Sequence, residues 1–301
     1  MVLFCADHPL IRAMILAWKG MHIMLDHRPE ALKARNFQTI ELAIDGPLAR
    51  IRLNRPDRLN ALSPLLLREL HQAVTSLGTG DSRARCLIIT GAGRGFSAGA
   101  DLLANSEEET VSEAAPPDLS RSLRSLYHPL IMALHDLPIP IIAAVNGPAA
   151  GAGMSLALTA DFILAARSAS FMQAFVQIGL APDAGSSWAL PRLIGPARAA
   201  RLMMLGEKLS AEDALSWGLV MAVHDDEKLL DEAEKLGHRL AQGPSQSYAA
   251  IRALLRASAD HDLPTQLELE AETQKKLGQT ADFIEGVRAF IEKRPARFSG
   301  Q

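Results

Sequence analysis

The sequence predicts an α/β fold with largely parallel strands, and two observations lead to this prediction. Three short apolar runs, Cys86–Thr90, Ile139–Val145 and Phe162–Ala166, have the length and composition of buried strands. Between them, apolar residues recur at helical spacing around Leu123–Leu134 and Gly151–Leu158. Strands that alternate with helices are typical of a mostly parallel sheet covered by helices.

The fold is expected to open with a hairpin and a helix. Apolar residues alternate on both sides of the turn pair Asp45-Gly46, and they are Ile40, Leu42, Ile44, Ala49, Ile51 and Leu53. This alternation around a turn predicts two antiparallel strands. A helix should begin at Ser63-Pro64, since proline is tolerated in a first turn. Its apolar positions recur at helical spacing and are Leu66, Leu67, Leu70, Val74 and Leu77.

The chain divides into three predicted parts. Residues 37–230 form the core, and residues 231–301 form a helical C-terminal region, because the strand signal stops after Val223. Residues 1–36 are an extension outside the core, since charges interrupt their apolar stretch and the order of a signal peptide is missing. The acidic, proline-bearing stretch 104–118 is expected to be a surface loop.

Composition excludes several classes of protein. With 301 residues, of which 48% are hydrophobic, the chain can bury a substantial core. Its net charge of −3 gives no basic bias toward nucleic acid. Its apolar N-terminal run is too short to span a membrane. Cys5 and Cys86 form no CxxC pair and the histidines show no metal-binding grouping, so we expect neither disulfides nor a metal site, in a cytoplasmic protein.

Two glycine-rich turns, each directly after a predicted strand, point to the chemistry. They are Gly91–Asp101 and Asn146–Gly153, and the second runs into a short apolar helix. Small residues let a backbone approach a ligand closely, and the start of a helix offers unpaired N–H groups. Two such turns facing one another would direct two N–H donors at one oxygen atom.

Other interpretations of these turns are open from the residues alone. The glycines can simply form tight turns. Dinucleotide binding is disfavoured, because Phe96 stands where the G-x-G-x-x-G pattern requires glycine. A serine hydrolase is disfavoured, because the segment around Ser155 lacks the last glycine of G-x-S-x-G and because Ser155 falls inside a predicted helix.

Together the motifs resemble those of the crotonase family, the enoyl-CoA hydratase/isomerase superfamily. The matching segments agree in order and spacing from about residue 37 to the C-terminus, and they are Leu53–Pro56, Asn60–Leu62, Phe96–Asp101, Ala144–Gly153, Gly179–Gly185, Leu190–Arg192, Leu209–Val220 and Glu285–Phe298. The resemblance implies a spiral of ββα units and C-terminal helices that build a homotrimer or a hexamer. It also implies an acyl-CoA thioester as substrate, with no separate cofactor.

The same resemblance implies where the thioester binds. Its carbonyl oxygen should sit between the N–H groups of Ala98 and Ala152, where each preorganised donor stabilises developing negative charge by roughly 3–4 kcal/mol. The other residues expected to contact the substrate are Arg58, Ala61, Ser97, Ala100, Asp101, Leu102, Gly151 and Phe175, with Phe290 and Lys293 reaching the CoA of a neighbouring subunit. An ordinary packing or surface role is the alternative for Phe290 and Lys293.

An isomerase is favoured over a hydratase. Hydratases of this family use two glutamates to add water, and Ser155 and Phe175 occupy those positions here. Asp183 matches the single acid of several isomerases, and one carboxylate suits an allylic shift, since it can take a proton at one carbon and return it two carbons away. Phe175 and Trp188 are expected to desolvate Asp183 and to raise its pKa.

Several alternatives stay open. An aspartate after proline is also a common turn residue, and a dehalogenase branch carries aspartate at the position of Asp183 as a nucleophile. The branch that the chain resembles most is that of the ring-1,2-epoxyphenylacetyl-CoA isomerases of phenylacetate degradation, which is also implied to shift double bonds. A crotonase-type lyase or hydrolase and a catalytically inactive CoA-binding protein are the remaining possibilities.

Overall fold

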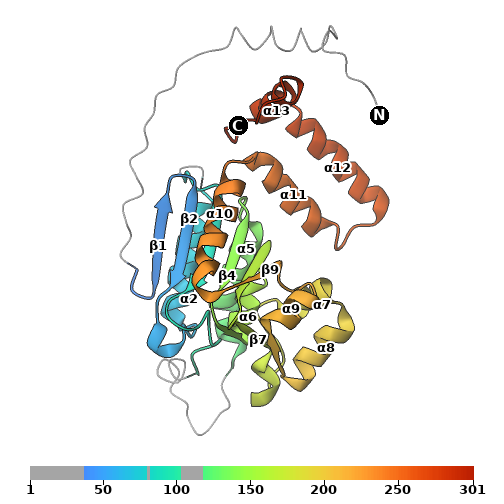
Figure 1. The fold of residues 1–301 in the computed structure, drawn as a ribbon. Helices are drawn as coiled ribbons and strands as arrows, with labels where there is room; N and C mark the ends of the chain where they lie inside the picture. Colours follow the sequence, from blue (N-terminus) through green and yellow to red (C-terminus); the bar gives the residue numbers. More distant parts are fainter. Residues whose placement is uncertain (1–36, 80–81, 103–117) are drawn as a thin grey trace.

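The computed structural model describes residues 37–79, 82–102 and 118–301. The predicted extension, residues 1–36, lies outside the described residues, as does the predicted loop 104–118 apart from Asp118. The described chain forms two β-sheets surrounded by helices, followed by a group of C-terminal helices (Figure 1).

A six-stranded sheet forms the centre of the core. Its order is β1-β2-β3-β4-β6-β9, and all neighbours pair in parallel except β1 and β2. The strands are β1 (Ile40–Asp45), β2 (Leu48–Leu53), β3 (Cys86–Gly91), β4 (Ile141–Val145), β6 (Phe162–Ala166) and β9 (Ala222–His224). The three apolar runs of the sequence therefore form three adjacent strands, β3, β4 and β6, which confirms the predicted α/β arrangement.

A smaller sheet lies beside the first. Strand β5 (Pro148–Ala150) pairs in parallel with β7 (Ser170–Met172), which pairs antiparallel with β8 (Lys208–Ser210). Because β5 follows β4 directly and precedes helix α6 (Ala152–Ala157), the second glycine-rich turn carries the chain from the large sheet into the small one.

The predicted hairpin and first helix are present. Strands β1 and β2 pair antiparallel, with Asp45 opposite Leu48 at the turn. Helix α2 (Pro64–Leu77) begins after Ser63, whose hydroxyl accepts the N–H of Leu66. This N-cap satisfies one of the donors that a helix start leaves unpaired. The predicted apolar face of α2 is buried in the core.

Further helices complete the core. They are η1 (Pro56–Arg58), α4 (Ser120–Ser122), η2 (Leu123–Tyr127), α5 (His128–Asp136), η3 (Ala174–Ile178), α7 (Ser186–Ile194), α8 (Pro196–Leu205), α9 (Ala211–Ser216), η4 (Asp226–Lys228) and α10 (Leu229–Ala241). Helix α10 packs against β3, β4 and β6. The predicted boundary at residue 230 thus falls in the first turn of a helix that covers the sheet.

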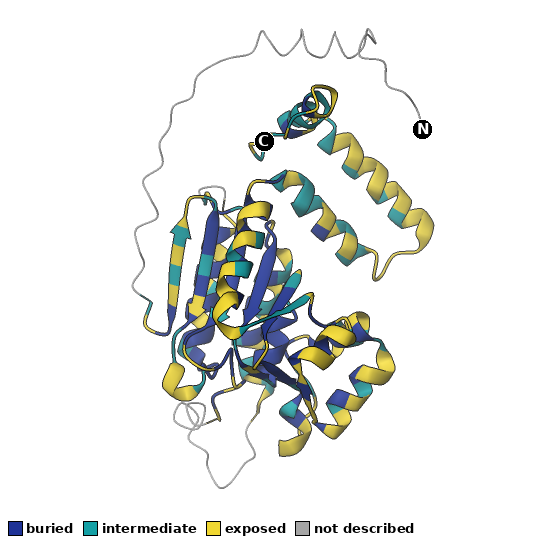
Figure 2. Ribbon diagram, viewed as in Figure 1, coloured by how far each residue is buried: buried dark blue, intermediate teal, exposed yellow. Residues whose placement is uncertain are grey.

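The C-terminal helices differ from the core in their burial. Helices α11 (Ser245–Ala257), α12 (Leu263–Leu277) and α13 (Ala281–Ile291) extend beyond the sheet, and Figure 2 shows α12 largely exposed while the strands are buried. No residue of α12 is buried. Arg85 fastens this region to the core, since its guanidinium donates to the hydroxyl of Ser245 and to the carbonyls of Gly243 and Phe298.

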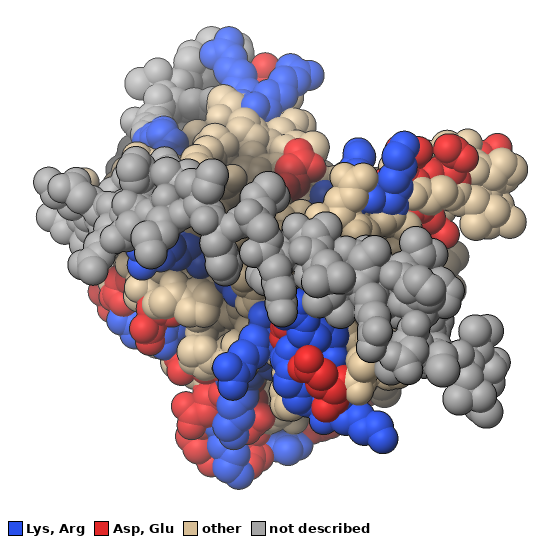
Figure 3. Space-filling model, turned by 90° about the horizontal axis from the view of Figure 1, so that it is seen from above, with Lys and Arg blue, Asp and Glu red and all other residues tan. Residues whose placement is uncertain are grey.

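Charge is mixed on the described surface. Seen from above, basic and acidic side chains alternate over the part of the surface that the structure describes (Figure 3). Many of them are ion-paired, as in Arg52 with Glu41 and Arg294 with Glu285.

Candidate active site

Two asparagine side chains hold the first glycine-rich turn in shape. Asn60, which is fully buried, donates from Nδ2 to two carbonyl groups of the turn at 2.9 and 2.8 Å. Asn146 accepts the N–H of Gly91 at 3.0 Å and donates to the carbonyl of Gly93 at 2.9 Å. Because Asn146 begins the second turn, these bonds fix the two turns relative to each other.

The two turns touch through their backbones. The N–H of Ala150 donates to the carbonyl of Ser97 at 2.9 Å. Gly99 has a φ of +95°, and a Cβ atom there would lie 2.8 Å from the carbonyl oxygen of Ala150. A Cβ atom at Gly153 would lie 2.4 Å from the carbonyl oxygen of Ser97. Only glycine fits at these two positions, and the close contact depends on it.

The two predicted oxyanion donors differ in their surroundings. Ala152 is the first residue of α6, so its N–H has no acceptor within the helix. The N–H of Ala98 donates to the carbonyl of Leu59 at 2.9 Å and is therefore not a free donor in this structure. Leu59 and Asn60 have φ values of 47° and 55°, which are uncommon for residues other than glycine. A Cβ atom at Gly99 would lie 3.5 Å from the Ala152 nitrogen, so the two turns bring the donors into one region.

Asp183 lies beside this region with an unpaired carboxyl oxygen. Ser155 connects it to the second turn, because the Ser155 hydroxyl donates to the carbonyls of Gly151 and Asp183 at 3.3 and 3.1 Å. Oδ1 of Asp183 is buried and has no hydrogen-bond partner among the described residues. Burial raises the pKa of Asp183 to about 6, because the charged form loses solvation. A carboxyl group with this pKa can both accept and release a proton near neutral pH.

Phe175 and Trp188, the aromatic residues expected to surround Asp183, differ in burial and in their neighbours. Phe175 is buried, and its ring lies 3.8 Å from where a Cβ atom of Gly151 would be, so it forms an apolar wall beside the second turn. Trp188 is 43% exposed. Its ring lies 4.2 Å below the Arg192 guanidinium and meets the edge of His135.

The other predicted contact residues fall into two groups. Those of the core lie in the first turn or next to it, and they are Arg58, Ala61, Ser97, Ala100, Asp101 and Leu102. Backbone hydrogen bonds join the segment of Ala61 to this turn, because the N–H of Leu62 donates to the carbonyl of Gly99 at 2.7 Å and the N–H of Asp101 donates to the carbonyl of Leu62 at 3.3 Å. Phe290 and Lys293 lie on α13 and just after it, at the opposite end of the molecule from α6 and β7 (Figure 1). Within one chain, the structure does not bring them to the turns.

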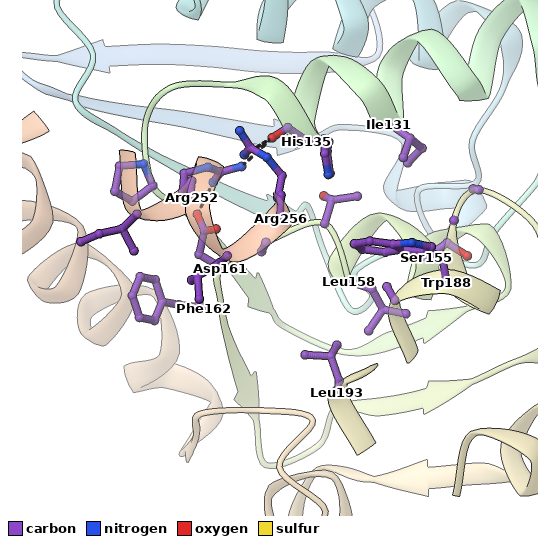
Figure 4. A pocket seen from close by; sticks show the side chains of 18 of the residues that line it. Ile131, His135, Ser155, Leu158, Asp161, Phe162, Trp188, Leu193, Arg252 and Arg256 are labelled. Atoms are coloured by element: carbon purple, nitrogen blue, oxygen red, sulfur yellow. Dashed lines mark hydrogen bonds and ion pairs between the residues drawn. The ribbon is translucent and has the colours of Figure 1, made fainter. Parts of the chain in front are cut away.

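A cavity lies next to the segment that carries Asp183. It has a volume of about 570 Å³ and lies between α5, α6, α7 and α11. Figure 4 shows Leu158 and Leu193 on one side and the ion pair of Arg252 with Asp161 at one end. None of the residues predicted to contact substrate lines it, and only Ser155, Ala184 and Gly185 connect it with Asp183.

Sequence reasoning did not identify two residues of this region. Arg55 forms an ion pair of 2.7 Å with Asp101, the last residue of the first turn. Tyr127 is buried, and its hydroxyl has no partner among the described residues. Arg55 belongs to a matching sequence segment, but Tyr127 occupies an apolar position of a helical pattern and has the sequence signature of a core residue.

Residues 37–79, 82–102 and 118–301 contain neither a cluster suited to a metal ion nor a membrane-spanning helix. No group of three or more histidine, cysteine or acidic side chains is placed to hold a metal ion in these ranges. Over the same ranges, no helix has the length and apolarity needed to cross a membrane.

Comparisons with known proteins agree with one another. Residues 43–301 match the model of the enoyl-CoA hydratase/isomerase family. The chain is 44% identical over 259 residues to the 1,2-epoxyphenylacetyl-CoA isomerase of Escherichia coli K12, covering 86% of this chain and 97% of that protein. It is also 44% identical over 266 residues to a Rhodobacter capsulatus protein named "Probable enoyl-CoA hydratase", covering 88% and 100%. The crystal structure of an enoyl-CoA hydratase from Bacillus anthracis matches with a TM-score of 0.81 at 32% identity, covering 88% of this chain and 100% of that one.

Proposed function

The chain belongs to the enoyl-CoA hydratase/isomerase family, and within this enzyme family we propose that it acts as an acyl-CoA isomerase. Family membership also confirms the predicted α/β crotonase fold with C-terminal helices. The proposed reaction moves a double bond, or rearranges a ring epoxide, in the acyl group of a CoA thioester. Its intermediate is an enolate.

The observation that supports an isomerase most strongly is the state of Asp183. Its backbone carbonyl accepts from Ser155 on the helix after the second turn, one of its carboxyl oxygens has no partner among the described residues, and its pKa is raised to about 6. In the proposed cycle the carboxylate removes a proton from the carbon next to the thioester. The C–H electrons move into the thioester and leave negative charge on its oxygen. The protonated Asp183 then delivers the proton two carbons away, so that the double bond moves and the carboxylate is regenerated.

The N–H groups of Ala98 and Ala152 are the proposed partners of the enolate oxygen. Removing one such donor costs roughly 3–4 kcal/mol of transition-state stabilisation in other enzymes. The Ala98 N–H donates to the carbonyl oxygen of Leu59 in this structure. The thioester oxygen therefore has to share this N–H with the Leu59 carbonyl or displace that carbonyl. Leu59 has an uncommon backbone conformation, and a shift of this residue would release the Ala98 N–H to the thioester oxygen.

A hydratase is the second candidate, because one relative at 44% identity is named as one. The residues at the two positions that hold glutamate in hydratases, Ser155 and Phe175, argue against a hydratase. Phe175 is buried and apolar. Ser155 is buried and donates its hydroxyl proton to two carbonyls, so it has no basic group to offer a water molecule. We therefore expect water addition to be slow compared with isomerisation.

The assembly and the binding of CoA belong to the same proposal. Phe290 is 83% exposed, and α12 has no buried residue, so this region has surface available for a second chain. A homotrimer or hexamer would allow Phe290 and Lys293 to meet the CoA of a neighbouring subunit. A cytoplasmic location is likewise part of the proposal.

The proposal is tested with three types of thioester. Incubation with a 3-enoyl-CoA should produce the absorbance of a conjugated thioester, while crotonyl-CoA should be hydrated much more slowly. Straight-chain and aryl acyl-CoAs should then be compared to find the preferred acyl group. Fast hydration of crotonyl-CoA without isomerisation would favour the hydratase. Binding of CoA thioesters without any turnover would favour a non-catalytic role.

A further inference from the structure

The helix that carries Tyr127 lies against the Asp183 turn. Ile131 on α5 approaches the turn directly, because its Cγ2 atom lies 3.6 Å from where a Cβ atom of Gly185 would be. Tyr127 precedes Ile131 by four residues along continuous helical backbone, so the two side chains share one face of the helix. Tyr127 is therefore one helical turn from a residue in contact with the segment that bears Asp183.

Two buried polar atoms in this region lack a partner. Tyr127 is only 4% exposed, and neither its hydroxyl nor Oδ1 of Asp183 has a hydrogen-bond partner among the described residues. Buried hydroxyl and carboxyl groups are normally hydrogen-bonded, and those left unpaired are typical of binding and catalytic sites. The two atoms do not bond to each other, so a third group is needed to pair with them.

The electrostatic surroundings determine what the hydroxyl can do. Burial raises the pKa of Tyr127 above its usual range, and the negative charges of Asp183 and Asp101 raise it further. The phenol thus stays protonated and is available as a hydrogen-bond donor. It is suited to an uncharged oxygen acceptor, because a second anion here would be repelled by both carboxylates.

The local backbone also marks this position. Residues Leu123–Tyr127 form a π-helical turn, in which the N–H of His128 donates to the carbonyl of Leu123. Pro129 follows at once, and a proline within a helix lacks an N–H and crowds the carbonyl four residues earlier, so the wider turn relieves a clash. Single π-helical turns are frequent at functional sites, because they re-aim a side chain.

We propose that Tyr127 binds substrate, and that its hydroxyl donates a hydrogen bond to an uncharged oxygen atom of the acyl group next to the carbons that Asp183 serves. This inference rests on the proposed function and narrows its substrate class to acyl-CoA thioesters with an epoxide, ether or hydroxyl oxygen in the acyl group. A plain hydrocarbon chain leaves the buried hydroxyl unpaired, and a site of this kind discriminates against a substrate that lacks the acceptor.

The test compares Tyr127→Phe with the wild type on two substrates, a ring-epoxide acyl-CoA and a straight-chain 3-enoyl-CoA. In Tyr127→Phe, we expect kcat/KM for the ring-epoxide acyl-CoA, divided by kcat/KM for the 3-enoyl-CoA, to fall about tenfold or more. The value for the 3-enoyl-CoA should change little. The melting temperature should not fall, since the hydroxyl has no partner to lose. Tyr248→Phe removes the same atom from the only other tyrosine of the chain, on α11, and should leave the ratio unchanged.

A binding measurement gives a readout that does not depend on turnover. The probes are a saturated acyl-CoA and its analogue with an ether oxygen in place of one methylene group, titrated by calorimetry. The wild type should prefer the ether, and Tyr127→Phe should lose this preference. If Tyr127→Phe weakens both substrates equally or changes neither, the inference is wrong while isomerisation by the wild type still supports the proposed function. If the wild type turns over neither substrate, the proposed function itself fails, and the inference fails with it.

Discussion

Two aspartates of this protein have pKa values that burial raises, but they lie in opposite chemical surroundings. Asp161, which begins the segment leading into β6, is ion-paired with Arg252 and accepts the N–H of Ile141 at 2.8 Å. Asp183 has one carboxyl oxygen with no partner at all among the described residues. Burial raises the pKa of both, but Arg252 opposes the shift at Asp161, whereas no opposing charge is resolved at Asp183.

This difference favours Asp183 over Asp161 as the carboxylate of the proposed proton transfer. A buried charge is tolerated when a partner compensates its lost solvation, and the Asp161–Arg252 pair joins β6 to α11 in this way. A carboxylate without compensation is unstable as an ion, and therefore exchanges its proton easily near neutral pH. A raised pKa alone does not distinguish the two aspartates, whereas their hydrogen-bond and ion-pair partners do.

The largest expected effect is the loss of isomerisation in Asp183→Asn. The amide keeps the shape of the side chain but cannot carry a proton, so we expect the rate to fall by about 10²- to 10⁴-fold. The rate is followed by the absorbance of the conjugated product from a 3-enoyl-CoA. Stability should be equal to that of the wild type or higher, because the variant removes a poorly solvated charge. Isomerisation at the wild-type rate would remove Asp183 from the mechanism.

The matched variant Asp161→Asn should show the reverse pattern. It leaves the guanidinium of Arg252 buried without its counter-ion, and we expect the free energy of unfolding to fall by about 3 kcal/mol. Urea denaturation measures this loss. At temperatures where the variant is folded, its isomerisation rate should match that of the wild type. A folded but inactive Asp161→Asn protein would contradict the account that Asp161 contributes to stability and not to the reaction.

Gly153→Ala should weaken the arrangement that both turns provide for Asp183. The added methyl group would lie 2.4 Å from the carbonyl oxygen of Ser97, so backbone has to move. We expect a loss of about 1–3 kcal/mol in the free energy of unfolding, together with reduced activity. Gly286→Ala on α13 is the control, because its methyl group would meet only the Phe298 ring at 3.5 Å. If both variants are equally stable and active, the turns are not in close contact.

The smallest effect is the pH dependence of stability due to Asp183. Its pKa in the folded protein, about 6, is raised above the ordinary aspartate value of 3.8, so the folded state binds the proton more tightly. This contribution to stability is present at low pH and is lost as pH rises from about 4 to 6. It amounts to at most about 3 kcal/mol, and partial solvent exposure reduces it further. The difference in unfolding free energy between the wild type and Asp183→Asn should change over this range, and a constant difference would contradict the raised pKa.

Local features of the fold were predictable from the sequence, and tertiary contacts were not. Alternation predicted the β1–β2 hairpin, and Pro64 in a first turn predicted the start of α2, because both signals depend on neighbouring residues. Asp183 could be identified only through the family resemblance, since aspartate after proline also fits a simple turn.

Other features of the structure depend on contacts between distant segments. The pairing of Asp161 with Arg252 joins residues that are 91 positions apart, and no local pattern encodes it. Tyr127 was missed for a related reason. An aromatic residue at a helical apolar position indicates core packing, and only the structure shows that its hydroxyl is unpaired.

The most direct test of the account is deuterium exchange in D₂O at the carbon next to the thioester, followed by proton NMR. The wild type should incorporate deuterium into a bound acyl-CoA, and Asp161→Asn should do so at the same rate. Asp183→Asn should show no incorporation above the uncatalysed rate. Exchange at the wild-type rate in Asp183→Asn would contradict the claim that the unpaired carboxylate moves the proton.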